Sequence, residues 1–118
     1  MKTARLIAAF CLIAAPAAAM AEATLSIPLT LGPDSQILTS RYSCAGGDPF
    51  TVQYVNTDAN TLALIPIDGA GRVFVNVVSG SGSRYVSGSH EWWVKGDDAT
   101  LTDQLQDGSA QDCTTVSE

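Results

Sequence analysis

The sequence predicts an all-β domain whose short antiparallel strands follow one another in a meander. After residue 21, short segments alternate apolar and polar side chains. Gly, Asp, Asn and Pro interrupt these segments at short intervals, as turns do between strands. Helix signals are nearly absent from the same region. In a domain this small, closure of the sheet removes exposed strand edges, so the pattern favours a barrel over a sandwich.

The first 21 residues are predicted to be a signal peptide. Lys2 and Arg5 form a positively charged start, and the apolar run over 6–15 is too short to span a bilayer. Ala19-Met20-Ala21 fits the rule of small residues flanking a cleavage site. We expect cleavage after Ala21, export to the periplasm, and a single domain over residues 22–118.

No membrane anchor is expected on the exported chain. A lipoprotein carries a cysteine at the cleavage point, whereas Cys11 lies inside the apolar run with Phe10 before it. Removal of Lys2 and Arg5 takes the formal charge from −6 to −8. This acidic balance argues against binding to nucleic acid or anionic membranes and favours a basic partner, although the charge can also serve solubility alone.

Cleavage leaves two cysteines, Cys44 and Cys113. In an oxidising compartment, two cysteines in a small domain predict one disulfide, here between residues 69 positions apart. A metal site and a cofactor are not expected, because the chain has one histidine and no Cys-x-x-Cys pair.

Nine segments have strand character when the chain is taken in order. The first, 24–31, contains Pro28 and is predicted to be an edge strand, because proline cannot donate to a ladder. Asp68 to Gly71 has the composition of a hairpin turn. The predicted segments are 24–31, 37–44, 50–55, 62–67, 72–78, 84–86, 91–94, 99–101 and 112–116.

Three features near residue 90 are candidate sites of chemistry. His90 could act with a serine in hydrolysis, but a lone histidine at a strand start is more often a surface residue. Asp97 and Asp98 could form a carboxylate dyad, but adjacent acids in a turn more often bind backbone N–H groups. Trp92 and Trp93 must point to opposite faces of one strand, so one of them is predicted to fill the interior.

The stretch from Ser79 to Leu101 holds most of the unusual residues. A Ser/Gly loop opens it, and Lys95, the only lysine after Lys2, stands at a Lys-Gly-Asp-Asp turn. Each feature alone is compatible with a flexible loop or a solvated side chain. Together they are also compatible with a binding tip.

The order of motifs resembles that of the MliC/PliC family of periplasmic inhibitors of c-type lysozyme. The matching elements are Cys44-Ala45-Gly46, Val52-Gln53-Tyr54, the loop from Ser79 to Tyr85, Trp93 to Leu101, and Cys113. The resemblance spans Cys44 to Cys113. It implies an eight-stranded antiparallel barrel and agrees with the Cys44–Cys113 disulfide.

The resemblance also implies a function and a site. It implies a non-enzymatic inhibitor whose Ser81 and Lys95 enter the cleft of c-type lysozyme. The protein is expected to be a monomer or weak homodimer. Gly82, Arg84, Tyr85 and Gly96 are expected to complete the lysozyme-binding surface. The role of the acids around Lys95 stays open: they could hold its side chain outward, or they could meet arginines of the enzyme. These acids are Glu91, Asp97 and Asp98. The alternative function is a periplasmic module that binds glycan or an envelope protein through an exposed tryptophan.

Overall fold

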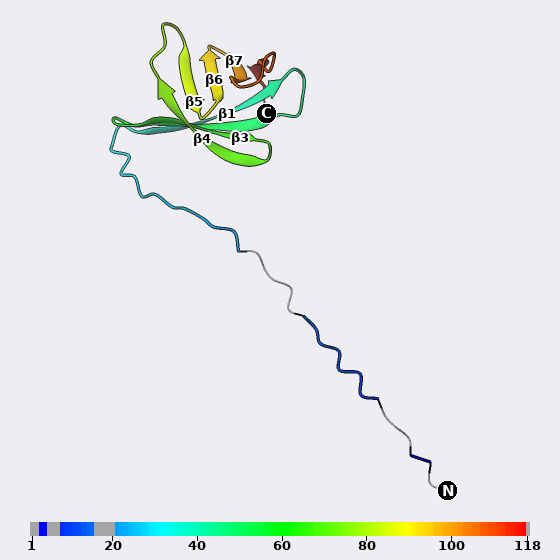
Figure 1. Ribbon diagram of the computed structural model, residues 1–118. Helices are drawn as coiled ribbons and strands as arrows, with labels where there is room; N and C mark the ends of the chain where they lie inside the picture. Colours follow the sequence, from blue (N-terminus) through cyan, green and yellow to red (C-terminus); the bar gives the residue numbers. More distant parts are fainter. Residues whose placement is uncertain (1–2, 5–7, 16–20, 118) are drawn as a thin grey trace.

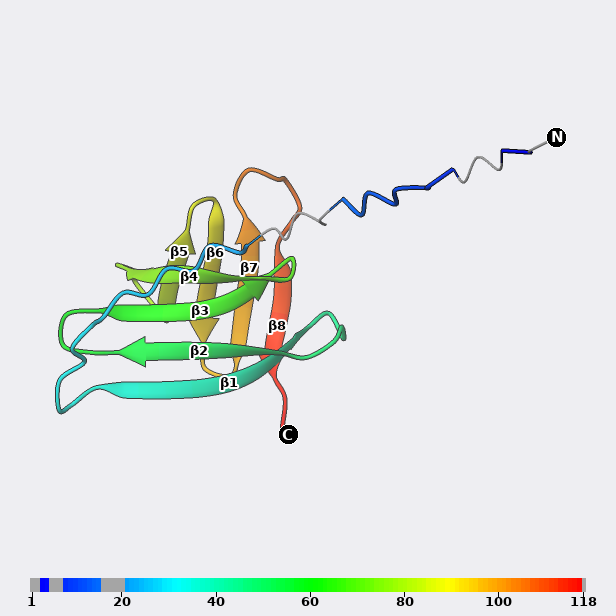
Figure 2. The ribbon, with the colours of Figure 1, turned by 90° about the horizontal axis from the view of Figure 1, so that it is seen from below.

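The computed structural model describes residues 3–4, 8–15 and 21–117. Its eight strands form one closed antiparallel barrel in which each strand pairs with its neighbours in sequence (Figures 1 and 2). The all-β class and the eight-stranded barrel are therefore confirmed. The strands are β1 (Gln36–Cys44), β2 (Phe50–Asn56), β3 (Thr61–Ile67), β4 (Ala70–Val77), β5 (Ser83–Ser87), β6 (His90–Lys95), β7 (Asp98–Asp103) and β8 (Gln111–Thr115).

The predicted signal peptide falls partly outside the described residues. Residues 1–2, 5–7 and 16–20, which include Lys2, Arg5 and part of the expected cleavage site, are among those not described. In the part of the chain that is described, no helix is long and apolar enough to cross a membrane.

The barrel closes where β1 pairs with β8. Cys44 and Cys113 lie directly opposite each other in this pairing and form a disulfide. The predicted disulfide is confirmed. Because β1 and β8 are the ends of the meander, the bond links the first strand to the last.

Alternation along the strands sends one set of side chains into the barrel. Trp92 is fully buried at the centre, and the ring of Tyr42 meets it edge-on with centroids 4.9 Å apart. The Trp92 indole donates a hydrogen bond of 2.9 Å to the Tyr54 hydroxyl, which is itself 2.9 Å from the Tyr42 hydroxyl. The interior tryptophan is thus Trp92, and its N–H is satisfied. The buried core consists of Tyr42, Val52, Ala63, Ile65, Phe74, Tyr85, Trp92, Ala99 and Cys113.

The strand predicted over 24–31 is wrong. Residues 21–35 contain no strand and leave the barrel as an extended segment (Figure 1). Its apolar side chains become more exposed with distance from the barrel: Leu29 is 49% exposed, Ile27 68% and Leu25 85%. A closed barrel offers no free edge to pair with, and Pro28 lacks a donor, so alternation alone does not produce a strand here.

The turns of a meander lie alternately at its two ends. The connections over 45–49, 68–69, 88–89 and 104–110 share one end of the barrel. The connections over 57–60, 78–82 and 96–97 share the other end. Asp68 and Gly69 both have positive φ, at +49° and +79°, as the predicted hairpin turn requires.

Candidate functional site

The Ser/Gly loop and the lysine turn meet at the same end of the barrel. The loop over 78–82 joins β4 to β5, and the turn over 96–97 joins β6 to β7. Since β5 pairs with β6, with Ser83 opposite Val94, the two connections are neighbours. Ser81, Gly82, Lys95 and Gly96 are all exposed there.

Trp93 contacts both connections. It faces outward on β6, as does Lys95 two residues later, because Trp92 and Val94, which flank Trp93, face inward. The Trp93 indole N–H donates a hydrogen bond of 2.9 Å to the backbone carbonyl of Ser81. The Lys95 ammonium lies over the Trp93 ring, 4.7 Å from its centroid, a cation–π distance.

Glycine at position 82 allows the loop to approach β6 closely. Gly82 has a φ of +63°, in the left-handed region. A Cβ added there would lie 2.9 Å from Lys95 Cγ and 3.2 Å from Trp93 Nε1, and would collide with the Val94 carbonyl. The Ser79 hydroxyl donates to the Gly82 carbonyl at 3.1 Å and fixes the loop from within. Only a residue without a side chain fits this contact.

Lys95 is the free cation of this surface, and Arg84 is not. The Arg84 Nε donates to Glu91 Oε2 at 2.6 Å, and the side chain of Gln104 donates to the same oxygen at 3.0 Å. Glu91 is therefore engaged by other partners. Within residues 21–117 Lys95 forms no ion pair, although Asp98 lies opposite it in the β6–β7 pairing. The Lys95 ammonium remains available to a partner.

The structure places the six predicted binding residues in two groups. Four of them, Ser81, Gly82, Lys95 and Gly96, come together at the exposed tip. Arg84 is half-buried in its ion pair with Glu91. Tyr85 is 6% exposed and belongs to the core, so it does not offer a contact surface.

Trp93 is the residue of this site that sequence reasoning missed. The sequence predicts only that Trp92 and Trp93 point to opposite faces of one strand. The available signal was its position two residues before Lys95 on a strand, which places both side chains on one face. Its hydrogen bond to a backbone carbonyl cannot be predicted from the order of side chains, because every residue carries such a carbonyl.

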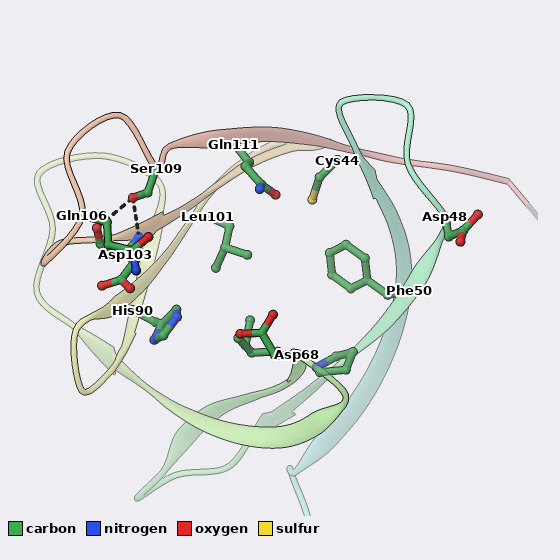
Figure 3. A pocket seen from close by; sticks show the side chains of 12 residues that line it. Cys44, Asp48, Phe50, Asp68, His90, Leu101, Asp103, Gln106, Ser109 and Gln111 are labelled. Atoms are coloured by element: carbon green, nitrogen blue, oxygen red, sulfur yellow. Dashed lines mark hydrogen bonds between the residues drawn. The ribbon is translucent and has the colours of Figure 1, made fainter.

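The opposite end of the barrel holds a cavity of about 440 Å³. Figure 3 shows Phe50 and Leu101 pointing into this opening and Asp68 at its rim. His90 also lines it, and the Arg72 guanidinium donates to His90 Nδ1 at 3.3 Å. A hydrolytic triad needs a carboxylate on the histidine nitrogen that faces away from the nucleophile. With Arg72 on Nδ1, the geometry does not favour the hydrolase interpretation of His90.

Asp103 has a structural role at the same cavity. A hydrogen bond from the Ser89 side chain, followed by one from the Leu105 backbone N–H, lowers the pKa of the Asp103 carboxyl. Leu105 N–H donates to Asp103 Oδ1 at 3.1 Å, and the Ser109 hydroxyl donates to the Asp103 carbonyl at 2.8 Å. These bonds shape the 104–110 connection. Among the residues described, no group of three or more His, Cys, Asp or Glu side chains could hold a metal ion.

Comparison with known proteins assigns the family. Residues 42–110 match the family model described as "Membrane-bound lysozyme-inhibitor of c-type lysozyme", which is more than half of the chain. The chain belongs to this family. A relative from Cupriavidus necator named "Membrane-bound lysozyme inhibitor of C-type lysozyme" is 39% identical over 106 residues, covering 90% of this chain and 83% of the relative.

A second relative and one solved structure agree with this assignment. A Pseudomonas aeruginosa protein of the same name is 44% identical over 72 residues, or 60% of this chain, and the match spans 57% of that relative's length. The crystal structure of Pseudomonas aeruginosa MliC in complex with hen egg white lysozyme superposes with a TM-score of 0.67 at 34% identity. It covers 81% of this chain and 100% of the MliC chain.

Proposed function

We propose that this protein is a non-enzymatic inhibitor of c-type lysozyme that places Ser81 and Lys95 in the enzyme's active-site cleft. The observation that carries the proposal is the exposed tip at which Ser81 and an unpaired Lys95 both contact Trp93. Support also comes from MliC of Pseudomonas aeruginosa, a member of the same family that was crystallised with hen egg white lysozyme.

The chemistry of the two side chains suits the target. C-type lysozyme cleaves glycosidic bonds between two carboxyl groups, one protonated and one ionised. The Lys95 ammonium carries three donors on a compact cation and can pair with the ionised group. The Ser81 hydroxyl can donate or accept, so it can bond either carboxyl state. The pair would occupy the sugar site and present no bond to cleave.

The remaining charge of the protein favours the encounter. The expected mature chain carries a formal charge of −8, which attracts a basic lysozyme and accelerates association. Arg84 is neutralised by Glu91, so it does not compete with Lys95 for the enzyme's carboxylate. Asp98, across from Lys95, also lies where it could meet an arginine at the rim of the enzyme.

The names of the two relatives describe membrane-bound lysozyme inhibitors. For this chain we propose a soluble periplasmic form released by cleavage after Ala21, because Cys11 does not stand at the cleavage point. Expression in a Gram-negative host should yield a chain that begins at Glu22 in the osmotic-shock fraction. A lipid-modified mass, or recovery only in the membrane pellet, would contradict this form.

The alternative, a glycan-binding module with an exposed tryptophan, finds less support. Trp93 is the outward tryptophan, but its N–H is bound to Ser81 and one face of its ring carries Lys95. Lys95 therefore takes up one of the two ring faces on which a sugar could stack, and the indole N–H is not free to bond a sugar hydroxyl.

One assay separates the two functions. The mature protein is added to hen egg white lysozyme that is digesting purified cell walls, and to the same walls without enzyme. A stoichiometric loss of lysis with no binding to the walls supports the inhibitor. Unchanged lysis together with binding to the walls supports the module.

A further inference from the structure

We infer that Trp93 is the positioning residue that joins the Ser81 loop and Lys95 into one preformed binding unit. The inference rests on the proposed function of this end of the barrel and deepens it. Ser81 lies in a loop outside the strand pairings. Lys95 is the last residue of β6 and pairs with Asp98 of β7, but this pairing holds its backbone and does not direct its side chain. Trp93 supplies the contact that each of them lacks.

Two contacts of different chemistry converge on the one indole. Its N–H donates to the Ser81 carbonyl at 2.9 Å, which fixes the height of the loop above β6. Its ring face lies 4.7 Å from the Lys95 ammonium, which fixes the direction of the cation. The two elements are therefore positioned by the same rigid group, and a shift of the indole moves both.

The packing of Gly82 supports the same conclusion independently. At this residue the loop lies so close to β6 that a Cβ would reach 3.2 Å from Trp93 Nε1 and 2.9 Å from Lys95 Cγ. Loop, indole and lysine stem are thus in mutual contact before any partner arrives. Trp93 itself is anchored by β6, which pairs with β5 on one side and β7 on the other.

Preorganisation explains how this arrangement raises affinity. A free lysine side chain and a flexible loop lose conformational freedom when they bind, and this loss weakens binding. A lysine already held over a ring and a loop already bonded to the same ring lose less. Trp93 would thereby strengthen binding without touching the enzyme.

The test uses two substitutions that remove different contacts. Trp93→Phe removes the N–H donor and keeps a ring, whereas Trp93→Leu removes both. Three quantities are measured: the Kd for hen egg white lysozyme, the amide hydrogen exchange of residues 80–82, and the ring-current shift of the Lys95 side-chain protons. The last two are measured on the free protein. Val75→Ala, at an outward position 50% exposed on β4, is the control.

Trp93→Phe is expected to speed exchange at residues 80–82, to keep most of the Lys95 shift, and to raise Kd about 3- to 10-fold. Trp93→Leu is expected to abolish the shift as well and to raise Kd more than about tenfold. Val75→Ala should change none of the three. In the Trp93→Leu background, Lys95→Ala should raise Kd by a smaller factor than in the wild type, because the cation has already lost its preorganisation.

Two results overturn the inference. One is unchanged exchange and an unchanged Lys95 shift in Trp93→Leu. The other is an unchanged Kd despite altered exchange and shift. A wild-type protein that fails to bind lysozyme contradicts the proposed function instead, and the measurements on the free protein then still support or overturn the positioning by Trp93.

Discussion

Cys44 and Cys113 stand directly opposite each other across the seam at which the barrel closes, and their disulfide crosses that seam. The β1–β8 pairing has three residue pairs in register, whereas β1 and β2 share seven. The covalent bond therefore reinforces a short pairing between strands far apart in sequence. Such a pairing depends on closure of a long loop, which is entropically unfavourable without the bond.

Removal of this disulfide should destabilise the barrel. For Cys44→Ala/Cys113→Ala, chain entropy for a separation of 69 residues predicts a loss of about 4 kcal/mol in the free energy of unfolding. Urea unfolding of the mature chain measures it. Wild-type protein reduced with dithiothreitol should unfold at the same urea midpoint as the double variant. A midpoint equal to that of the oxidised wild type would contradict the role of the bond.

Lys95→Ala should be the most damaging single change to inhibition. If the cation pairs with a carboxylate in the enzyme, its loss should weaken binding by about 2–5 kcal/mol. Inhibition constants against hen egg white lysozyme measure the effect. Arg41→Ala makes the same change in net charge at a half-buried position on β1, and it should alter only the association rate slightly. Equal inhibition by wild type and Lys95→Ala would eliminate the proposed mechanism.

Ser81→Ala should cost less than Lys95→Ala. A neutral hydrogen bond contributes about 1 kcal/mol net. The loop should keep its position, because Trp93 bonds the Ser81 carbonyl rather than its hydroxyl. The same inhibition assay applies, and a larger loss for Ser81→Ala than for Lys95→Ala would reverse the ranking of the two side chains.

Gly82→Ala should disrupt the tip, whereas Gly80→Ala should not. Gly82 combines a φ of +63° with contacts that a Cβ cannot share, while nothing lies within 4 Å of a Cβ at Gly80. For Gly82→Ala we expect a loss of roughly 1–3 kcal/mol in unfolding free energy, from the strained backbone. Weaker inhibition should accompany it, because the loop must move away from Lys95.

Gly80→Ala is the matched control in the same loop. Its unfolding free energy should stay within about 0.5 kcal/mol of wild type. Thermal or urea unfolding and the inhibition constant are measured for both variants. Comparable inhibition by the two would show that close approach of the loop to β6 is not needed for binding.

The strands of the barrel could be predicted because alternation and turn residues act locally. The eight predicted segments from 37–44 onward correspond to β1–β8, with boundaries shifted by a few residues. Alternation failed over 24–31, because whether an alternating segment pairs depends on a free edge, and closure of the barrel removes every edge.

The candidate site was predictable only in part. The resemblance supplied Ser81 and Lys95, and the meander brings them to one end of the barrel. Tyr85 was grouped with them, although alternation against Arg84 sends its side chain to the core. The contact between Trp93 and the Ser81 carbonyl could not be predicted, because a backbone acceptor twelve residues away is available in any sequence.

The barrel should lose stability at alkaline pH. Burial, followed by the hydrogen bond with Tyr42, raises the pKa of Tyr54 far above its ordinary value, and burial also raises the pKa of Tyr85. In the unfolded chain the phenols of Tyr54 and Tyr85 both ionise at about pH 10. As the pH rises past that value the unfolded state releases its protons first, so stability is intact below about pH 10 and falls above it. Urea midpoints between about pH 8 and 11 measure the decline.

Tyr85→Phe is the cleaner variant for assigning this decline. The Tyr54 hydroxyl accepts the Trp92 N–H, so Tyr54→Phe would leave a buried donor without a partner and lower stability at every pH. Within residues 21–117 no hydrogen bond involves the Tyr85 hydroxyl. Removal of this hydroxyl in Tyr85→Phe should therefore preserve the stability of the barrel at about pH 8. It should also make the loss of stability at alkaline pH shallower. A decline as steep as that of the wild type would assign the proton release to other groups.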